Sequence, residues 1–200
     1  MAKERVGIMG GTFDPIHNGH LVIAESVRDA FSLSKVIFIP AADPPHKPAM
    51  IDAVHRLRMV WLATNSNPYF QVLDIELKRE GPSYSVDTIQ SLVEQCEDRC
   101  EFYFIIGADE LNILPEWHKI EELVTLCRFI IAKRPGVEAD MSRVCEMLGE
   151  AAQRRFYFCD TPELEISSTD IRKRIRDRQS VRYILPQEVE AYVRKEGLYL

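Results

Sequence analysis

No apolar run in the 200-residue sequence approaches the length of about 18 residues that a membrane-spanning helix requires. The first five residues lead directly into an apolar strand and contain no apolar segment of the kind found in signal peptides. These two absences predict a cytoplasmic protein that has no membrane partner.

The sequence has fewer positive than negative charges, because it contains 25 Lys and Arg residues against 31 Asp and Glu residues. Its net charge is −6. Such a chain has no general attraction to nucleic acid, so we expect no nucleic-acid partner, and anionic ligands must be held by local basic groups. A basic run between residues 172 and 178 lacks the aromatic platform of many RNA-binding surfaces. It is more typical of a solvated helix that supplies one phosphate ligand.

The motif C-x-x-C is absent from the sequence, although the chain contains five cysteines. Cys96 and Cys100 have a spacing loosely like that of metal ligands, but no histidine or second pair accompanies them. We therefore expect reduced structural thiols and no metal held by protein side chains.

Long linkers, internal repeats and low-complexity segments are also missing, so we expect a single domain over residues 1–200. Strands are predicted at residues 5–9, 36–40, 70–72, 102–107, 128–132 and 156–158. Helices are predicted at residues 19–31, 52–64, 84–96, 120–126, 141–152, 169–177 and 187–195. The alternation predicts an α/β fold with a doubly wound, mostly parallel sheet and closing C-terminal helices. The first strand is not followed by G-x-G-x-x-G, which disfavours a bound NAD cofactor.

Residues 10–20, GGTFDPIHNGH, join the first strand to the first helix and carry the clearest chemistry. Gly10 and Gly11 are expected to let the backbone turn sharply and approach a ligand closely. Asn18 is a candidate N-cap, and free N–H groups at the helix start favour an anion. His17 and His20, three residues apart, share one face of a helical turn. The pattern predicts a phosphate-binding turn with two imidazole ligands.

The same stretch resembles the G-T-F-D-P-x-H-x-G-H signature of the nucleotidyltransferase superfamily, which transfers AMP or CMP to phosphorylated acceptors. Residues 166–172, ISSTDIR, match the superfamily motif I-S-S-T-x-I-R, and Ser167 with Asp170 also fits a capping box. Within the superfamily, residues 10–20 resemble most closely the bacterial nicotinate mononucleotide adenylyltransferases. The resemblance implies a Rossmann-like nucleotidyltransferase fold over nearly the whole chain.

Weaker motifs follow predicted strands or begin a predicted helix, and each has a purely structural alternative. Residues 44–47, PPHK, offer positive charge or form a solvated loop tip. Residues 83–88, SYSVDT, resemble S-Y-T-x-x-T with Ser85 in place of Thr, or simply cap a helix. Asp109 can accept bonds from ribose hydroxyls or cap a helix. Trp117 can stack on a flat ring, whereas Trp61 is expected in the core. Arg134 can grip a phosphate or lie in a surface turn.

The resemblance implies three groups of site residues. The catalytic residues are His17, His20 and Arg172. The ATP-binding residues are Gly10, Gly11, Thr12, Phe13, His17, His20, Gly107, Asp109, Ile166, Ser167, Ser168 and Arg172. The acceptor-binding residues are Thr12, His46, Lys47, Tyr84, Ser85, Thr88, Trp117, His118 and Arg134.

The implied reaction transfers AMP from ATP to nicotinate mononucleotide, with Mg²⁺ accompanying ATP. The sequence has no recognisable catalytic Ser or Cys arrangement, and a phosphate acceptor that is already anionic needs none. Two alternatives stay open: a related adenylyl- or cytidylyltransferase with another acceptor such as phosphopantetheine, or a nucleotide-binding regulatory module without turnover. Assembly into a homo-oligomer is left open as well.

Overall fold

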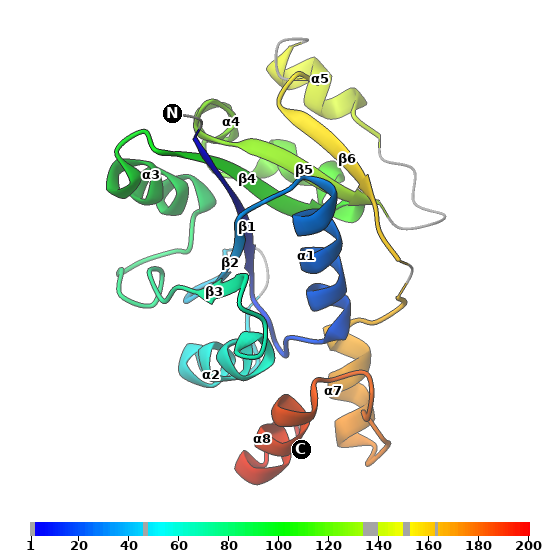
Figure 1. Ribbon diagram of the computed structural model, residues 1–200. Helices are drawn as coiled ribbons and strands as arrows, with labels where there is room; N and C mark the ends of the chain where they lie inside the picture. Colours follow the sequence, from blue (N-terminus) through cyan, green and yellow to red (C-terminus); the bar gives the residue numbers. More distant parts are fainter. Residues whose placement is uncertain (1–2, 46–47, 134–139, 150–152, 163) are drawn as a thin grey trace. The chain divides into compact units, whose positions relative to one another are not determined.

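The computed structural model describes residues 3–45, 48–133, 140–149, 153–162 and 164–200 (Figure 1). Its strands are β1 (Glu4–Gly11), β2 (Lys35–Pro40), β3 (Phe70–Val72), β4 (Cys100–Gly107), β5 (Arg128–Lys133) and β6 (Phe156–Asp160). Its α-helices are α1 (Asn18–Ala30), α2 (Ala53–Thr64), α3 (Ser85–Cys96), α4 (Ile120–Leu126), α5 (Ser142–Leu148), α7 (Ser168–Arg176) and α8 (Gln187–Glu196). Two short 3-10 helices, η1 (Ala108–Asn112) and η2 (Leu114–Glu116), follow β4.

The six strands form one sheet in the order β3-β2-β1-β4-β5-β6. The pairs β1–β4, β4–β5 and β5–β6 are parallel, with Glu4 opposite Cys100 and Ile8 opposite Phe104. This strand order reverses direction between β1 and β4, which is the switch point of a doubly wound fold. The predicted fold class is therefore confirmed.

The chain divides into two compact units. The first comprises the chain up to residue 9, residues 23–37 and residues 84–163. The second comprises residues 10–22, 38–83 and 164–200. The expectation of a single domain over residues 1–200 stays a prediction.

In the first unit, the apolar runs that predicted strands form the buried interior. The four central residues of β5, Phe129 to Ala132, have no exposed surface, and β4 is buried from Phe102 to Ile106. Helix α3 lies against α4 (Figure 1). No helix in the described ranges is long and apolar enough to cross a bilayer.

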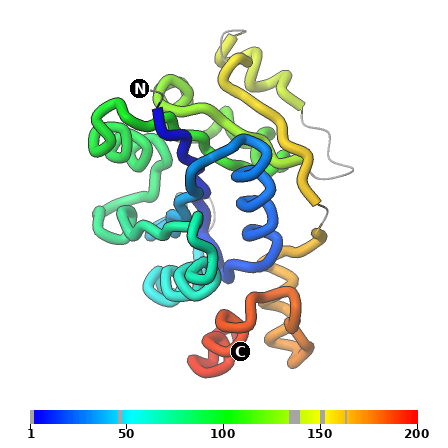
Figure 2. Tube along the Cα trace, viewed as in Figure 1, coloured from blue at the N-terminus to red at the C-terminus, as the bar shows by residue number. Residues whose placement is uncertain are grey.

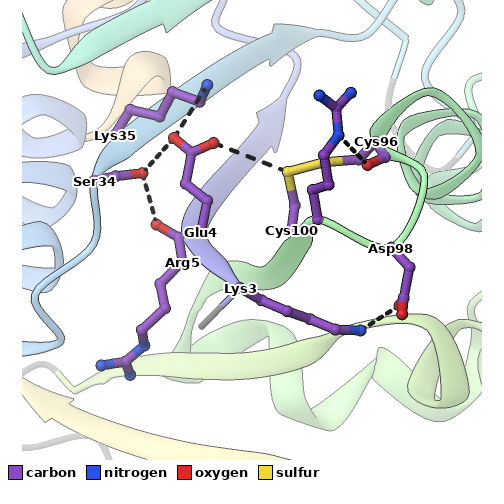
Figure 3. The surroundings of a disulfide bond; sticks show 9 residues. Lys3, Glu4, Arg5, Ser34, Lys35, Cys96, Asp98 and Cys100 are labelled. Atoms are coloured by element: carbon purple, nitrogen blue, oxygen red, sulfur yellow. Dashed lines mark hydrogen bonds and ion pairs between the residues drawn. A yellow bond between two sulfur atoms is a disulfide. The ribbon is translucent and has the colours of Figure 1, made fainter. Parts of the chain in front are cut away.

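A disulfide joins Cys96, the last residue of α3, to Cys100, the first residue of β4 (Figure 3). The prediction of reduced thiols is wrong for this pair, whereas the other three cysteines are free. The cause is local, since Glu97 and Asp98 both adopt the left-handed conformation, with φ of 47° and 63°. Together they reverse the chain and place the two cysteine Cα atoms 5.9 Å apart, a normal separation for a disulfide.

In the second unit, α2 packs against α8 and against β3, so the end of the chain lies beside a segment more than 120 residues earlier (Figure 2). Met59, Val60 and Ala63 of α2 face the interior. Trp61 does not, because 44% of its surface is exposed and the Arg58 guanidinium lies 4.6 Å from its ring centroid. The prediction that Trp61 belongs to the core is therefore wrong.

Candidate active site

The turn after β1 begins later than predicted. Gly10 and Gly11 are the last two residues of β1, and neither takes a positive φ. The residue in the left-handed conformation is Phe13, with φ of 49°. Its ring is buried, with centroid distances of 5.2 Å to His20 and 6.0 Å to Phe38. Packing of this aromatic ring therefore fixes a backbone conformation that the sequence assigned to glycine.

His17 and His20 lie side by side, as their spacing predicts. Their rings are stacked with centroids 3.7 Å apart, and His20 Nδ1 accepts a bond of 3.2 Å from the His17 N–H. His17 is only 4% exposed. Helix α1 begins between them at Asn18, whose side-chain amide donates to the Tyr183 carbonyl at 2.8 Å. Two preorganised imidazoles thus stand at the start of a helix, where backbone N–H groups favour an anion.

Gly19 lies close to the His17 imidazole. A Cβ atom at Gly19 would lie 3.0 Å from His17 Nδ1 and 3.6 Å from the Cβ of Ile166. A side chain at this position would fit only if the His17 imidazole moved by a few tenths of an ångström. Ile166, which precedes the cap of α7, lies beside the same turn.

Helix α7 has the N-cap that the sequence predicts. The Ser167 side chain accepts a bond of 3.1 Å from the Asp170 N–H. The carboxylate of Asp170 pairs with Arg174 at 2.7 Å, on the exposed side of the helix. One half of the expected capping box is therefore present, and the remaining N–H groups at the start of α7 are available to an anion.

Helix α7 is also bonded directly to the turn that carries the two imidazoles. Ser168 Oγ donates to the Pro15 carbonyl at 2.9 Å, and Arg172 Nη1 donates to the Asp14 carbonyl at 2.7 Å. The other Arg172 nitrogen, Nη2, donates to Thr169 Oγ1 at 3.2 Å. Residues about 150 positions apart in sequence are thus brought together within the second unit.

Two further side chains, those of Tyr199 and Arg56, reach this turn and were missed by sequence reasoning. The buried Asp14 carboxylate accepts from the Tyr199 hydroxyl at 2.7 Å and from the Met50 N–H at 2.7 Å. The Arg56 guanidinium donates to the Thr12 carbonyl at 2.8 Å. Burial lowers the pKa of Arg56, while burial and the bond to Asp14 raise the pKa of Tyr199. The available signal was the place of Arg56 on the helix face that also carries Ala53, Val60 and Ala63.

In the first unit, Asp109 lies where the sequence places it, two residues beyond the end of β4. Its carboxylate is exposed in the first turn of η1 and folds back over Gly107. A Cβ atom at Gly107 would lie 2.4 Å from Asp109 Oδ1, so a side chain there would require this carboxylate to move. An exposed carboxylate held at a strand end can accept hydrogen bonds from a pair of ribose hydroxyls.

The start of α3 is not capped by a serine. Tyr84 occupies the N-cap position without a side-chain cap, and Ser85 is the first helical residue. The Ser83 hydroxyl instead accepts bonds from the N–H groups of Ala42 and Asp43 at 2.9 and 3.1 Å. The alternative that Ser83 or Ser85 caps α3 is therefore wrong.

Trp117 lies in a half-buried position of the first unit. Its ring meets Phe104 edge to face, with centroids 5.8 Å apart, and its buried indole N–H has no partner among the described residues. The adjacent His118 ring stacks on Tyr84 at 4.1 Å. The Thr88 hydroxyl turns back to the Tyr84 carbonyl at 3.3 Å. The rings of Trp117, His118 and Tyr84 therefore lie near the start of α3, among the residues that the sequence assigns to the acceptor.

Three predicted acceptor residues, His46, Lys47 and Arg134, lie outside the described residues. Within the described ranges, no group of three or more His, Cys, Asp or Glu side chains is placed to hold a metal ion.

Comparison with known proteins gives consistent matches. The model of the cytidylyltransferase-like family matches residues 8–174. A protein of Thermoanaerobacter sp. (strain X514), named a probable nicotinate-nucleotide adenylyltransferase, is 45% identical, covering 100% of this chain and 96% of its own length. One of the same name from Moorella thermoacetica is 46% identical over 98% and 91%. The structure of Plasmodium falciparum nicotinic acid mononucleotide adenylyltransferase complexed with NaAD matches with a TM-score of 0.81 at 22% identity, covering 98% of this chain and 97% of that one.

Proposed function

The chain belongs to the cytidylyltransferase-like family and, within it, to the nicotinate-nucleotide adenylyltransferases, and from this membership we propose that it transfers AMP from ATP to nicotinate mononucleotide. The products are nicotinate adenine dinucleotide and pyrophosphate, so the reaction is a step in NAD biosynthesis. A substrate as general as ATP favours the cytoplasm as its location.

The chemistry requires no nucleophile from the protein. An oxygen of the acceptor phosphate bonds to the α-phosphorus of ATP, while the bond from that phosphorus to the bridging oxygen of the β-phosphate breaks and pyrophosphate leaves. A phosphate monoester has its second pKa at about 6, so the attacking oxygen is already anionic at neutral pH. The protein must therefore overcome repulsion between anions and hold them in line.

The observation that carries this proposal is the junction of the two helix starts in the second unit. The stacked imidazoles of His17 and His20 flank the first residues of α1, and Ser168 and Arg172 of α7 bond to the turn that precedes this helix. We assign His17 to the α-phosphate, where charge develops in the transition state. His20, Ser168 and Arg172 are assigned to the leaving pyrophosphate. Mg²⁺ enters with ATP as part of the substrate.

The nucleoside and acceptor assignments rest on residues of the first unit. Asp109 accepts hydrogen bonds from the ribose of ATP, and Trp117 stacks on the pyridine ring. Backbone N–H groups near Ser85 and His118 face the nicotinate carboxylate. Lys47 and Arg134 are assigned to the acceptor phosphate from the family resemblance alone.

The test is a pyrophosphate-release assay with a panel of acceptors, run with ATP and with CTP. We expect turnover with ATP and nicotinate mononucleotide, and a product whose mass is that of nicotinate adenine dinucleotide. Turnover only with phosphopantetheine, or only with CTP, would instead assign the chain to another branch of the superfamily. Binding of ATP without pyrophosphate release from any acceptor would indicate a regulatory nucleotide-binding module.

A further inference from the structure

Arg56 is a buried cation whose hydrogen bonds all go to backbone carbonyls. It is 1% exposed and lies in α2. Its Nη1 donates to Thr12 O at 2.8 Å and to Ala41 O at 2.6 Å, and Nη2 donates to Ala42 O at 3.1 Å. Its Nε donates to Ile51 O at 3.2 Å. One guanidinium therefore joins the turn after β1 to the loop after β2.

A buried charge of this kind contributes little to stability by itself, because desolvation offsets most of what its hydrogen bonds gain. An apolar side chain of similar volume would fill the same space. What the guanidinium adds is geometry, since its rigid fork of donors fixes the relative positions of the carbonyls of Thr12, Ala41 and Ala42. These acceptors belong to the two loops that the sequence associates with phosphate.

The penultimate residue of the chain holds the same turn from another direction. The Tyr199 ring is buried at 6% exposure, and its hydroxyl donates to Asp14 Oδ1 at 2.7 Å. The second oxygen of Asp14 accepts from the Met50 N–H. The Asp14 carbonyl accepts from Arg172. Asp14 is therefore fixed at its carboxylate and at its backbone, three residues before His17.

We propose that Arg56 and Tyr199 are positioning residues for adenylyl transfer, which hold the backbone of residues 12–15 so that His17 and His20 meet the transferring phosphates. The proposal rests on the function proposed above and adds to it a requirement for the last residues of the chain. A displacement of about 1 Å in such a turn can reduce a rate by about 10²-fold, so loosening one of several anchors should have a smaller effect of the same kind.

The first test is Tyr199→Phe, with Tyr192→Phe as the matched control. Tyr192 also belongs to the C-terminal segment, and its variant loses the bond between the hydroxyl and His55 Nδ1 at 2.8 Å, which lies outside the turn. We expect Tyr199→Phe to speed hydrogen exchange of the amides of residues 12–20. We expect kcat to fall by about tenfold while KM for ATP changes by less than about twofold. Tyr192→Phe should leave both properties at parental values.

The second test is Arg56→Lys against Arg56→Met. Lysine keeps the positive charge but has fewer hydrogen-bond donors than arginine. At equal folded fraction, we therefore expect Arg56→Lys to have a higher kcat than Arg56→Met, although a lower one than the parent. Parental exchange of residues 12–20 together with parental kcat in Tyr199→Phe would overturn the proposal. A parent protein with no turnover on any acceptor would overturn the proposed function instead, and the exchange measurements would still decide whether these residues fix the turn.

Discussion

At the scale of single residues, the two imidazoles at the start of α1 are the side chains that we assign to the transferring phosphates. His17→Ala and His20→Ala should each keep the overall fold, because the strands of the sheet have apolar cores that contain neither ring. Each should reduce kcat by about 10²–10³-fold, the usual cost of losing one preorganised donor to a transition state. The measurement is steady-state turnover at saturating ATP and nicotinate mononucleotide, with circular dichroism as the check on folding.

The matched control for both variants is His55→Ala, which removes a half-buried imidazole from α2 that bonds Tyr192 and lies outside the turn. It should keep turnover close to that of the parent. Near-parental kcat in His17→Ala or in His20→Ala would show that the assigned role of that residue is wrong.

The two tryptophans offer a second comparison at the same scale. Trp117→Ala should remove ring stacking worth about 1–3 kcal/mol, and so raise KM for nicotinate mononucleotide by about 5- to 150-fold. KM for ATP should stay nearly unchanged. Trp61→Ala, at an exposed position of α2, should leave both constants unchanged. An unchanged acceptor KM in Trp117→Ala would indicate that Trp117 serves only to pack against Phe104.

At the scale of elements, the start of α7 carries an observed cap, and we propose that it also binds an anion; the two roles can be separated. Ser167→Ala removes the bond from the Asp170 N–H and should lower the free energy of unfolding by about 1 kcal/mol. Ser167→Asn should keep both stability and ATP use. Ser167→Asp should keep stability, because aspartate caps helices well, but should raise KM for ATP by placing a negative charge beside phosphate.

Chemical denaturation and steady-state kinetics on the three Ser167 variants distinguish these effects. If Ser167→Asp used ATP as well as Ser167→Asn does, the start of α7 would be a structural cap with no phosphate near it.

The connection between α3 and β4 is constrained by a disulfide. The Cys96–Cys100 disulfide closes a loop of five residues, and the chain-entropy estimate for such a loop is about 2 kcal/mol. Replacing both cysteines with serine should lower the free energy of unfolding by up to that amount in the absence of reductant. Dithiothreitol should have the same effect on the parent and none on the double variant. Cys145→Ser, which removes a free thiol, is the control. Equal stability of the parent with and without reductant would contradict the prediction.

At the scale of the whole molecule, the sheet order and the net charge of −6 both bear on how the protein selects its anionic ligands. The chain does not attract anions generally, so selectivity among them must come from donors presented at particular helix starts and strand ends. Backbone N–H groups near Ser85 and His118 can donate but not accept. They suit a carboxylate, whereas an amide would place its NH₂ against another donor.

The protein should therefore prefer nicotinate mononucleotide to nicotinamide mononucleotide by about 10²-fold in kcat/KM, since a bound amide would leave polar groups unpaired. Measuring both acceptors at fixed ATP checks this. Nicotinate riboside, which lacks the attacking phosphate, is the control and should release no pyrophosphate. Equal kcat/KM for acid and amide would eliminate the proposed carboxylate pocket.

The sequence by itself determined the elements and the two principal motifs. Runs such as residues 102–107 and 128–132 are apolar enough to be buried on both faces, and the amphipathic segments between them have helical spacing, so element positions follow from local pattern. The spacing of His17 and His20 and the cap at Ser167 are also local properties, which is why the structure reproduces them.

Tertiary structure alone decided the features that depend on partners distant in sequence. Phe13 takes the left-handed conformation because its ring packs on Phe38, and no local pattern indicates that contact. Arg56 and Tyr199 reach the turn only when α2 and the end of the chain come to it, across separations of 44 and 185 residues. The sequence showed which groups could meet phosphate, but the long-range hydrogen bonds that hold those groups in place exist only in the folded chain, because their acceptors are backbone carbonyls and a carboxylate brought together by folding.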